Sequence, residues 1–137
     1  MTKQNHQSSI FQSSIKVSER EEKFDLEERT YQFALAVRKL VKSHRWSTEQ
    51  RTDVTQILRS SGSVAANYVE ANNPISSADF SHRLRIARKE ASESRLWLRL
   101  IGETSDDDRK ATLRYLYREA DALTRILTSI LHKLGDR

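Results

Sequence analysis

The sequence lacks cysteine altogether, and it contains only one proline and three glycines among its 137 residues. Without cysteine the protein can form neither disulfides nor thiolate metal sites, which is compatible with a reducing compartment. Proline and glycine punctuate turns and interrupt helices, so their scarcity argues against a turn-rich β architecture. We therefore expect an all-α protein with long helices.

Long hydrophobic runs are missing as well. No stretch of about 18 apolar residues could cross a bilayer, and the serine- and glutamine-rich N-terminal region lacks the apolar core of a secretory signal. Hydrophobic residues make up 36% of the chain and charged residues 31%, so the fold must separate the two strictly on helix faces. We expect a cytoplasmic protein without a membrane partner, and its length fits a single core.

Sequence signatures of catalysis are absent too. The chain has no Walker-type glycine loop and no H-E-x-x-H motif, and its four histidines are scattered. A di-iron bundle needs two Glu-x-x-His motifs, whereas the nearest approach is the single Asp79-x-x-His82. We therefore predict no catalytic residue, no metal site and no cofactor. An enzyme that uses Glu70 or Glu93 remains an alternative, although no neighbouring groups are expected to position its substrate.

Positive charge predominates in the chain. Twenty-four lysines and arginines against nineteen aspartates and glutamates give a formal net charge of +5, and the sequence pI is about 9.7. Such a balance favours polyanionic partners, nucleic acid above all, and the alternative is an ordinary basic protein.

The N-terminal region differs from the rest of the sequence. It holds two similar segments, residues 7–10 and 12–15, and then a charged run at residues 19–23, without sustained helical periodicity. We predict a flexible N-terminal tail over residues 1–22 and a folded domain over residues 23–137.

Apolar residues recur at three- and four-residue steps through the rest of the chain, which is the period of a helix. Asp25 is expected to cap the first helix, and Ser47 with Gln50 forms a capping box for the second. The expected helices run from Asp25 to about His44, from the capping box to Asn72-Asn73-Pro74, from Ser77 or Asp79 to about Glu103, and from Asp106-Asp107-Asp108 to Gly135. Short connections make neighbours antiparallel, so we predict an antiparallel up-and-down four-helix bundle with a disordered N-terminal tail.

Each expected helix carries one stripe that should form the core. The stripes are Leu26, Thr30, Phe33, Val37, Leu40 and Val41; Val54, Ile57, Leu58, Ser61, Val64, Ala65 and Tyr68; Phe80, Leu84, Ala87, Ala91, Ser94, Leu98 and Ile101; and Leu113, Leu116, Tyr117, Ala120, Leu123, Leu127, Ile130, Leu131 and Leu134. Small residues in the middle of the third stripe should let a neighbouring helix approach closely.

The second and third expected helices carry two linked patterns. Residues 59–71 read RSSGSVAANYVEA, and they are followed by Phe80, Leu84, Ile86, Ala87 and Glu93. The two segments resemble the patterns R-x-x-x-S-(I/V)-x-x-N-(I/V)-x-E and F-x-x-x-L-x-I-A, with a later Glu, of the 23S rRNA intervening-sequence family. The sequence departs from the family at Tyr68, where Ile is frequent, and at Ala71-Asn72, where a Gly commonly follows the Glu. The resemblance spans residues 24–134.

This resemblance implies a left-handed bundle that assembles into a ring-like homo-oligomer, a pentamer in characterised relatives, without assigned catalysis. Related basic bundles act as accessory proteins of reverse transcriptases. The implied partners are therefore further copies of the chain, RNA or DNA, and a reverse transcriptase or another protein.

The third expected helix has two further surfaces beside its core stripe. A basic ridge lies to one side, where arginine forks could follow a phosphate backbone without reading bases. The proposed nucleic-acid-binding residues are Arg85, Arg88, Lys89, Arg95 and Arg99. The alternatives are that these charges are solvated or form salt bridges between subunits.

An apolar zone lies further round the same helix and consists of Ile86, Leu96, Trp97 and Leu100. We expect it to be an oligomer interface, because one core stripe cannot bury it; the alternative is a wide stripe that faces two helices of the same bundle. If nucleic acid is not bound, the same zone favours a protein–protein adaptor or scaffold ring.

Four polar residues of the two patterns are predicted to be structural. We expect Ser63, Asn67, Glu70 and Glu93 to form hydrogen bonds across helices or to arginines, because buried polar groups need partners.

Overall fold

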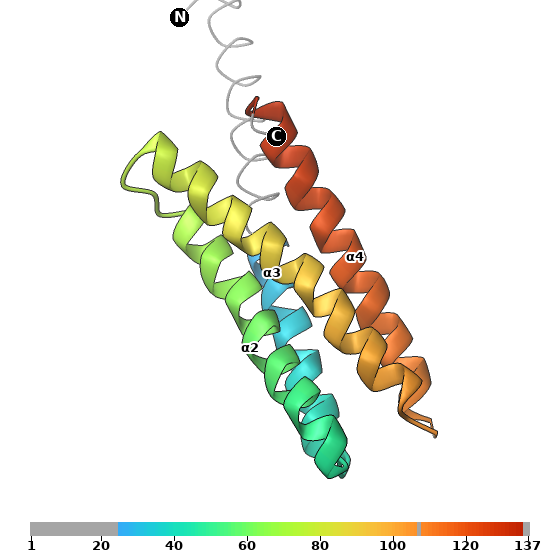
Figure 1. The fold of residues 1–137 in the computed structure, drawn as a ribbon. Coiled ribbons are helices and arrows are strands. Elements are labelled where there is room, and N and C mark those ends of the chain that lie inside the picture. The colour runs from blue at the N-terminus through green and yellow to red at the C-terminus, as the bar shows by residue number, and fades with distance from the viewer. Residues whose placement is uncertain (1–24, 107, 136–137) are drawn as a thin grey trace, which may run out of the picture.

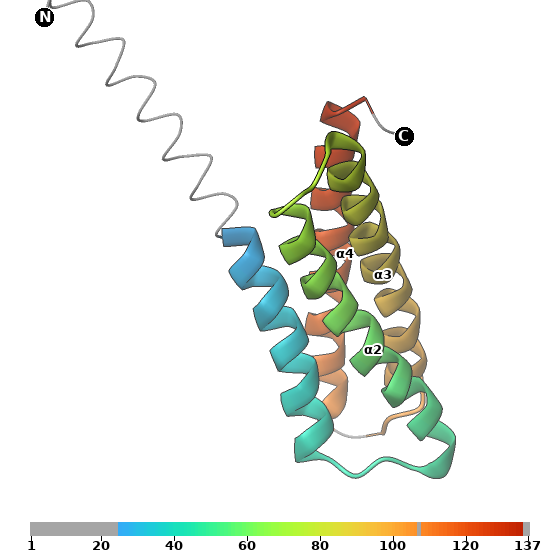
Figure 2. The ribbon, with the colours of Figure 1, turned by 90° about the vertical axis from the view of Figure 1, so that its left-hand side faces the viewer.

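The computed structural model describes residues 25–106 and 108–135, and within these ranges it contains helices and no strand. Consecutive helices run antiparallel in an elongated bundle (Figures 1 and 2), which confirms the predicted four-helix fold. The tail predicted at residues 1–22 lies outside the described residues. The helices comprise residues 25–43, α2 (Thr48–Ala71), α3 (Ser77–Glu103) and α4 (Arg109–Lys133).

The helix ends follow local sequence signals. The capping box is confirmed, since the Gln50 amide donates to the Ser47 hydroxyl at 3.2 Å and the Ser47 amide donates to Oε1 of Gln50 at 3.3 Å. Ser76 caps α3, because its hydroxyl accepts from the Asp79 amide at 3.0 Å. Asp25 is itself helical, so it is not the predicted N-cap, which requires non-helical dihedral angles.

The C-terminus of α4 comes close to the predicted position. Gly135 follows the helix with φ of +76° and donates its amide to the His132 carbonyl at 3.0 Å. A left-handed residue after the last turn favours glycine, since any side chain there is strained.

The predicted stripes form the core where the four helices meet. Most of their members are buried, including Phe33, Ile57, Leu98 and Leu127. Residues that are only partly buried are Val41, Leu58, Ala65, Phe80 and Ile130.

Two residues predicted for the core are exposed instead. Tyr117 is 37% exposed, because it lies on the flank of α4 that faces α3 and not on the central stripe of α4. Leu134 is 50% exposed, because it is the C-cap of α4 at the end of the bundle.

Small polar residues bring α2 and α3 together in the core. The hydroxyls of Ser60 and Ser94 lie 2.8 Å apart, and both residues are fully buried. Ser94 also donates to the Glu90 carbonyl at 2.8 Å, so these buried hydroxyls are satisfied. The close approach expected from the small residues of α3 therefore occurs against α2.

The helical segment 25–43 packs beside both α2 and α4 (Figure 2). Arg29 donates to both carboxylate oxygens of Glu119 on α4, at 2.7 and 3.0 Å. Arg38 donates to the Leu58 carbonyl on α2 at 3.2 Å. In the described part of the chain, none of the helices combines the length and hydrophobicity that crossing a membrane requires.

Candidate nucleic-acid interface

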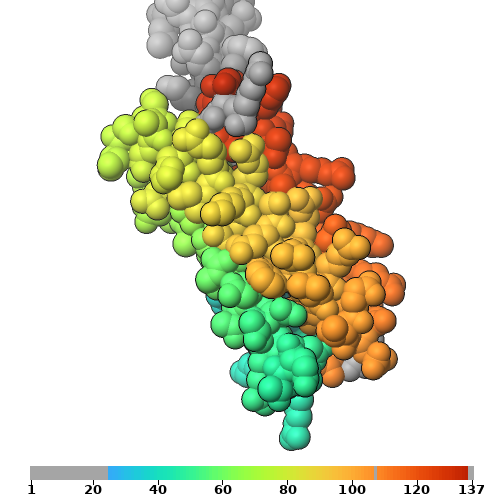
Figure 3. Space-filling view, in the orientation of Figure 1, coloured from blue at the N-terminus to red at the C-terminus, as the bar shows by residue number. Residues whose placement is uncertain are grey.

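A cationic groove lies between the C-terminal part of α3 and the N-terminal part of α4. The surfaces of these two segments, in shades of orange, adjoin in Figure 3. Its volume is about 280 Å³. Arg99 from α3 and Lys110, Arg114 and Arg118 from α4 line it, together with a single carboxylate, that of Glu103. The other lining residues, which we call the groove floor, are Leu98, Gly102, Leu113 and Tyr117.

The helical period places the cations of α4 in a row. Lys110, Arg114 and Arg118 follow one another at four-residue steps, which brings successive side chains to about 6 Å. Burial of Leu113 and Leu116 fixes the rotation of α4 about its axis and leaves this row beside α3.

None of the four groove cations, Arg99, Lys110, Arg114 and Arg118, forms an ion pair with a residue that the structure describes. Their positive charges can therefore attract an anionic ligand into the groove.

Arg95 is engaged within the protein, unlike these four cations. Its Nη1 contacts Oδ1 of Asp121 on α4 at 2.8 Å, and its Nη2 donates to the Ser92 hydroxyl at 2.8 Å. Asp121 also contacts Nε of Arg125 at 3.1 Å. Arg95 thus ties α3 to α4 and helps to hold the two walls of the groove together.

The remaining residues of the predicted basic ridge are spread along α3. Arg85 and Lys89 are exposed, and Arg88 is half-buried. The structure brings Arg99 together with three cations of α4 that the sequence prediction missed. Their four-residue spacing was visible in the sequence, but only the packing of α4 against α3 joins them to Arg99.

The predicted apolar zone divides in the structure. Leu96 and Leu100 are 50% and 40% exposed, one helical turn apart on α3. Ile86 and Trp97 are half-buried, and Trp97 packs against the core. The indole Nε1 of Trp97 is buried without a hydrogen-bond partner among the described residues.

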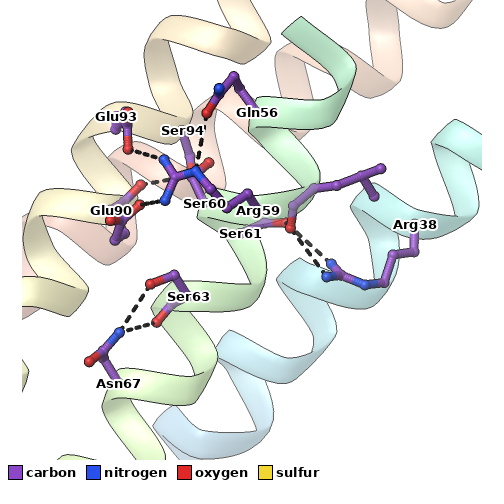
Figure 4. Close-up of polar contacts among 11 residues, drawn as sticks. Arg38, Gln56, Arg59, Ser60, Ser61, Ser63, Asn67, Glu90, Glu93 and Ser94 are labelled. Carbon is purple, nitrogen blue, oxygen red and sulfur yellow. Dashed lines mark hydrogen bonds and ion pairs between the residues drawn. The ribbon is translucent and has the colours of Figure 1, made fainter. Parts of the chain in front are cut away.

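A second polar cluster joins the two sequence patterns across α2 and α3 (Figure 4). Arg59 on α2 donates to Oε2 of Glu93 at 2.6 Å and to Oε2 of Glu90 at 3.1 Å. Its Nε donates to the Gln56 side chain at 3.1 Å. We call Arg59, Glu90 and Glu93 the Arg–Glu–Glu cluster; the sequence prediction included only Glu93 as a polar contact.

The two carboxylates of the cluster have opposite pKa shifts. Burial raises the pKa of Glu90, and the neighbouring Glu93 raises it further against the attraction of Arg59. Burial also acts to raise the pKa of Glu93, but its hydrogen bond with Arg59 and the other polar contacts outweigh burial and lower the pKa. The Trp97 indole contributes to this lowering without completing a hydrogen bond. Glu90 is therefore the first of the pair to take up a proton.

The other predicted structural residues differ in their contacts. Asn67 donates to the Ser63 carbonyl at 2.9 Å and to its hydroxyl at 3.0 Å, both within α2, and it accepts from Arg83 on α3 at 3.4 Å. Glu70 is exposed, and among the described residues its carboxylate forms no hydrogen bond or ion pair, in contrast to the predicted bridging role. No group of three or more potential ligands among the described residues could hold a metal ion.

Comparison with known proteins shows a family model and solved structures to which this chain is similar. The model of 23S rRNA-intervening sequence proteins matches residues 22–129. A solved structure from Bacteroides thetaiotaomicron VPI-5482, of a protein with unknown function from the S23 ribosomal protein family, is 31% identical with a TM-score of 0.69. That match covers 80% of this chain and 97% of the other. No curated protein matches.

Proposed function

This chain belongs to the family of 23S rRNA-intervening sequence proteins, and on that premise we propose that it is a non-enzymatic, homo-oligomeric bundle that binds nucleic acid without regard to base sequence. The observation that carries the proposal is the cationic groove between α3 and α4. Four cations line it, Arg99, Lys110, Arg114 and Arg118, against the single carboxylate of Glu103.

Phosphate recognition suits these side chains. Arginine presents a planar fork of donors that matches two phosphate oxygens, whereas lysine acts as a point charge. Contacts of this kind position a nucleic acid and carry no base information, so the binding should tolerate any sequence. Arg88 and Lys89 would extend the contact along α3, while Arg95 would keep α3 and α4 in place through Asp121.

Self-association would place several cationic grooves in one assembly. Leu96 and Leu100 are exposed on the same helix as Arg99, and we propose them as part of a contact between copies of the chain. Several grooves in one assembly could then bind one strand, which raises the apparent affinity through effective concentration. A ring of five copies is the assembly that the family resemblance implies, and a reverse transcriptase or another protein is a further partner that it implies.

The test is mass determination by light scattering, with and without a short mixed-sequence RNA, together with anisotropy titrations at two salt concentrations. If each protomer neutralises four phosphates, the affinity should fall about fiftyfold between roughly 50 and 200 mM salt, because condensed counterions are released on binding. Replacing Arg99, Arg114 and Arg118 together by glutamine should remove most of the affinity and flatten this salt dependence.

A matched control replaces Lys39, Lys42 and Arg51 by glutamine. These three cations are exposed on the helical segment 25–43 and on α2, so the control has the same net charge as the groove variant but an intact groove. We expect it to bind RNA like the wild type. Equal losses in both triple variants would show that overall charge alone attracts RNA, and a wild type that ignores RNA at low salt would refute the proposal.

A second candidate function is a protein–protein adaptor or scaffold ring that does not bind nucleic acid. The exposure of Leu96 and Leu100 favours it. The double variant Leu96→Asp and Leu100→Asp should then abolish assembly. An unchanged mass would exclude this surface as the interface, and a ring that ignores RNA would favour the adaptor.

A further inference from the structure

The groove between α3 and α4 has an aromatic and apolar floor beneath its charged rim. Tyr117 is 37% exposed there and is the one aromatic ring among the described residues that line the groove. Leu98 and Leu113 beside it are almost completely buried, at 1% and 2% exposure, so they close the groove toward the core. The groove therefore offers an aromatic side chain that is partly open to solvent and lies among cations.

Binding to the backbone of a duplex would require the cations of the groove but not its aromatic side chain. A row of cations alone can follow the phosphates of a double helix, whose base faces are covered by their stacked neighbours. A nucleotide with an unpaired base presents both a planar apolar face and an adjacent phosphate. Stacking of such bases on aromatic side chains inside a positively charged groove is how proteins hold single strands without reading their sequence.

The dimensions of the groove suit one base. Its volume of about 280 Å³ lies just below the range of roughly 300–1,000 Å³ that is usual for small-molecule pockets. The space is too small for a structural element of a partner protein, and the row of α4 cations that lines it could hold a continuing backbone.

The distribution of charge also orients the strand. Glu103 and Arg99 both come from α3, one turn apart, whereas Lys110, Arg114 and Arg118 form an uninterrupted cationic row on α4. Phosphates are repelled by the carboxylate of Glu103, so the backbone should follow α4. The base would then point toward α3 across the ring of Tyr117.

From this arrangement we infer that the groove selects single-stranded over double-stranded nucleic acid by stacking an unpaired base on Tyr117 while Arg114 and Arg118 bind the flanking phosphates. The inference rests on the function proposed above and specifies its substrate class. A free nucleotide offers the same base and phosphate chemistry as a nucleotide in a strand, and the experiment separates these two sources.

The experiment uses four probes with the full chain at low salt. They are a mixed-sequence RNA of about 16 nucleotides, the blunt duplex of that sequence, an abasic strand of equal length, and a mixture of free ribonucleoside monophosphates. We expect the single strand to bind about tenfold more tightly than the duplex or the abasic strand, which matches the gain from one stacked base. Free monophosphates should compete weakly, because only one phosphate accompanies each base.

Three tyrosine variants assign the effect to the ring. Tyr117→Leu should weaken binding of the single strand about tenfold and leave the duplex and abasic affinities unchanged, whereas Tyr117→Phe should bind like the wild type. Tyr115→Leu is the matched control, because Tyr115 is also on α4 and is more exposed, at 64%, but does not line the groove. Thermal melting would verify that every variant is folded.

The outcomes separate this inference from the proposed function. Equal binding of strand, duplex and abasic strand, or an unaltered Tyr117→Leu variant, would overturn base stacking and leave sequence-independent phosphate binding in place. Tight binding of free monophosphates alone would replace the strand by a mononucleotide ligand and would overturn both. No binding of any probe would refute the proposed function together with the inference.

Discussion

Neutralising Glu90 should stabilise the protein, whereas neutralising Glu93, one turn away, should destabilise it. Both carboxylates contact Arg59, at 3.1 and 2.6 Å, and glutamine is nearly isosteric with glutamate. The difference arises because burial raises the pKa of Glu90 while the bond with Arg59 lowers the pKa of Glu93. A charge on Glu90 therefore weakens the folded state, and a charge on Glu93 strengthens it.

The magnitudes follow from burial and partners. A hydrogen bond between charged groups contributes about 1.5–3 kcal/mol, but the side chains of Arg59 and Glu93 are 47% and 32% exposed, so solvent screens it. We expect Glu93→Gln to lose about 1 kcal/mol of unfolding free energy. The side chain of Glu90 is only 11% exposed. Because the amide oxygen in the Glu90→Gln variant would still accept from Arg59, removing the buried charge should gain about 0.5–1 kcal/mol.

Urea unfolding monitored by circular dichroism at several pH values is the appropriate assay. The folded pKa of Glu90 lies above its unfolded value, so its penalty is fully present at neutral pH and disappears as the pH falls below both values. The folded pKa of Glu93 lies below its unfolded value, so its contribution is present at neutral pH and is lost as the pH falls through the folded pKa. Both variants should approach the wild type in acid, from opposite sides.

A loss of stability in both variants at neutral pH would refute this reasoning. Glu90 would then be an ordinary ion-pair partner of Arg59, and the desolvation of its carboxylate would not be the dominant effect.

Three further predictions concern the groove, a helix cap and the core. Asp121→Asn keeps a side-chain oxygen that can accept from Arg95, and so keeps the tie between α3 and α4, but it removes a negative charge near the groove. RNA should therefore bind more tightly and with a steeper salt dependence in anisotropy titrations, and an unchanged affinity would place the binding surface elsewhere. Ser47→Ala removes the hydroxyl that accepts from the Gln50 amide and should cost about 1 kcal/mol in urea unfolding, whereas Ser47→Asp should retain most of the stability. Leu127→Ala leaves a cavity at a fully buried position and should lower the free energy of unfolding by about 3 kcal/mol. A decrease below about 1 kcal/mol would contradict the described core.

Periodicity and capping chemistry account for most of what the sequence predicted correctly. Stripes at three- and four-residue steps identified buried positions such as Val37, Val64 and Leu84, because an amphipathic helix in a bundle has one side on which to bury apolar groups. Ser47 and Gln50 marked the start of α2 through a local contact that requires no tertiary structure.

The candidate site could be predicted only in part, because it depends on how two helices face each other. A wheel of α3 places Arg95 and Arg99 on one side, but it cannot show that Asp121 neutralises the first while Arg114 and Arg118 surround the second. The periodicity places Tyr117 in the core for the same reason, whereas the structure exposes it, since a residue on the flank of a stripe is buried or exposed according to the helix that packs beside it. Pairing across an antiparallel helix pair is tertiary information, and one helix period does not contain it.

The antiparallel turn between α3 and α4 makes the candidate interface local in sequence. All the residues that line the groove fall between Leu98 and Arg118, so a single helical hairpin contains the whole of it. Closing so short a segment costs little chain entropy, and contacts of low sequence separation are those that form fastest during folding. The groove is therefore a compact unit of one helical hairpin: grafting residues 95–121 onto another antiparallel helix pair would transfer its cations, its tyrosine and the Arg95–Asp121 ion pair together.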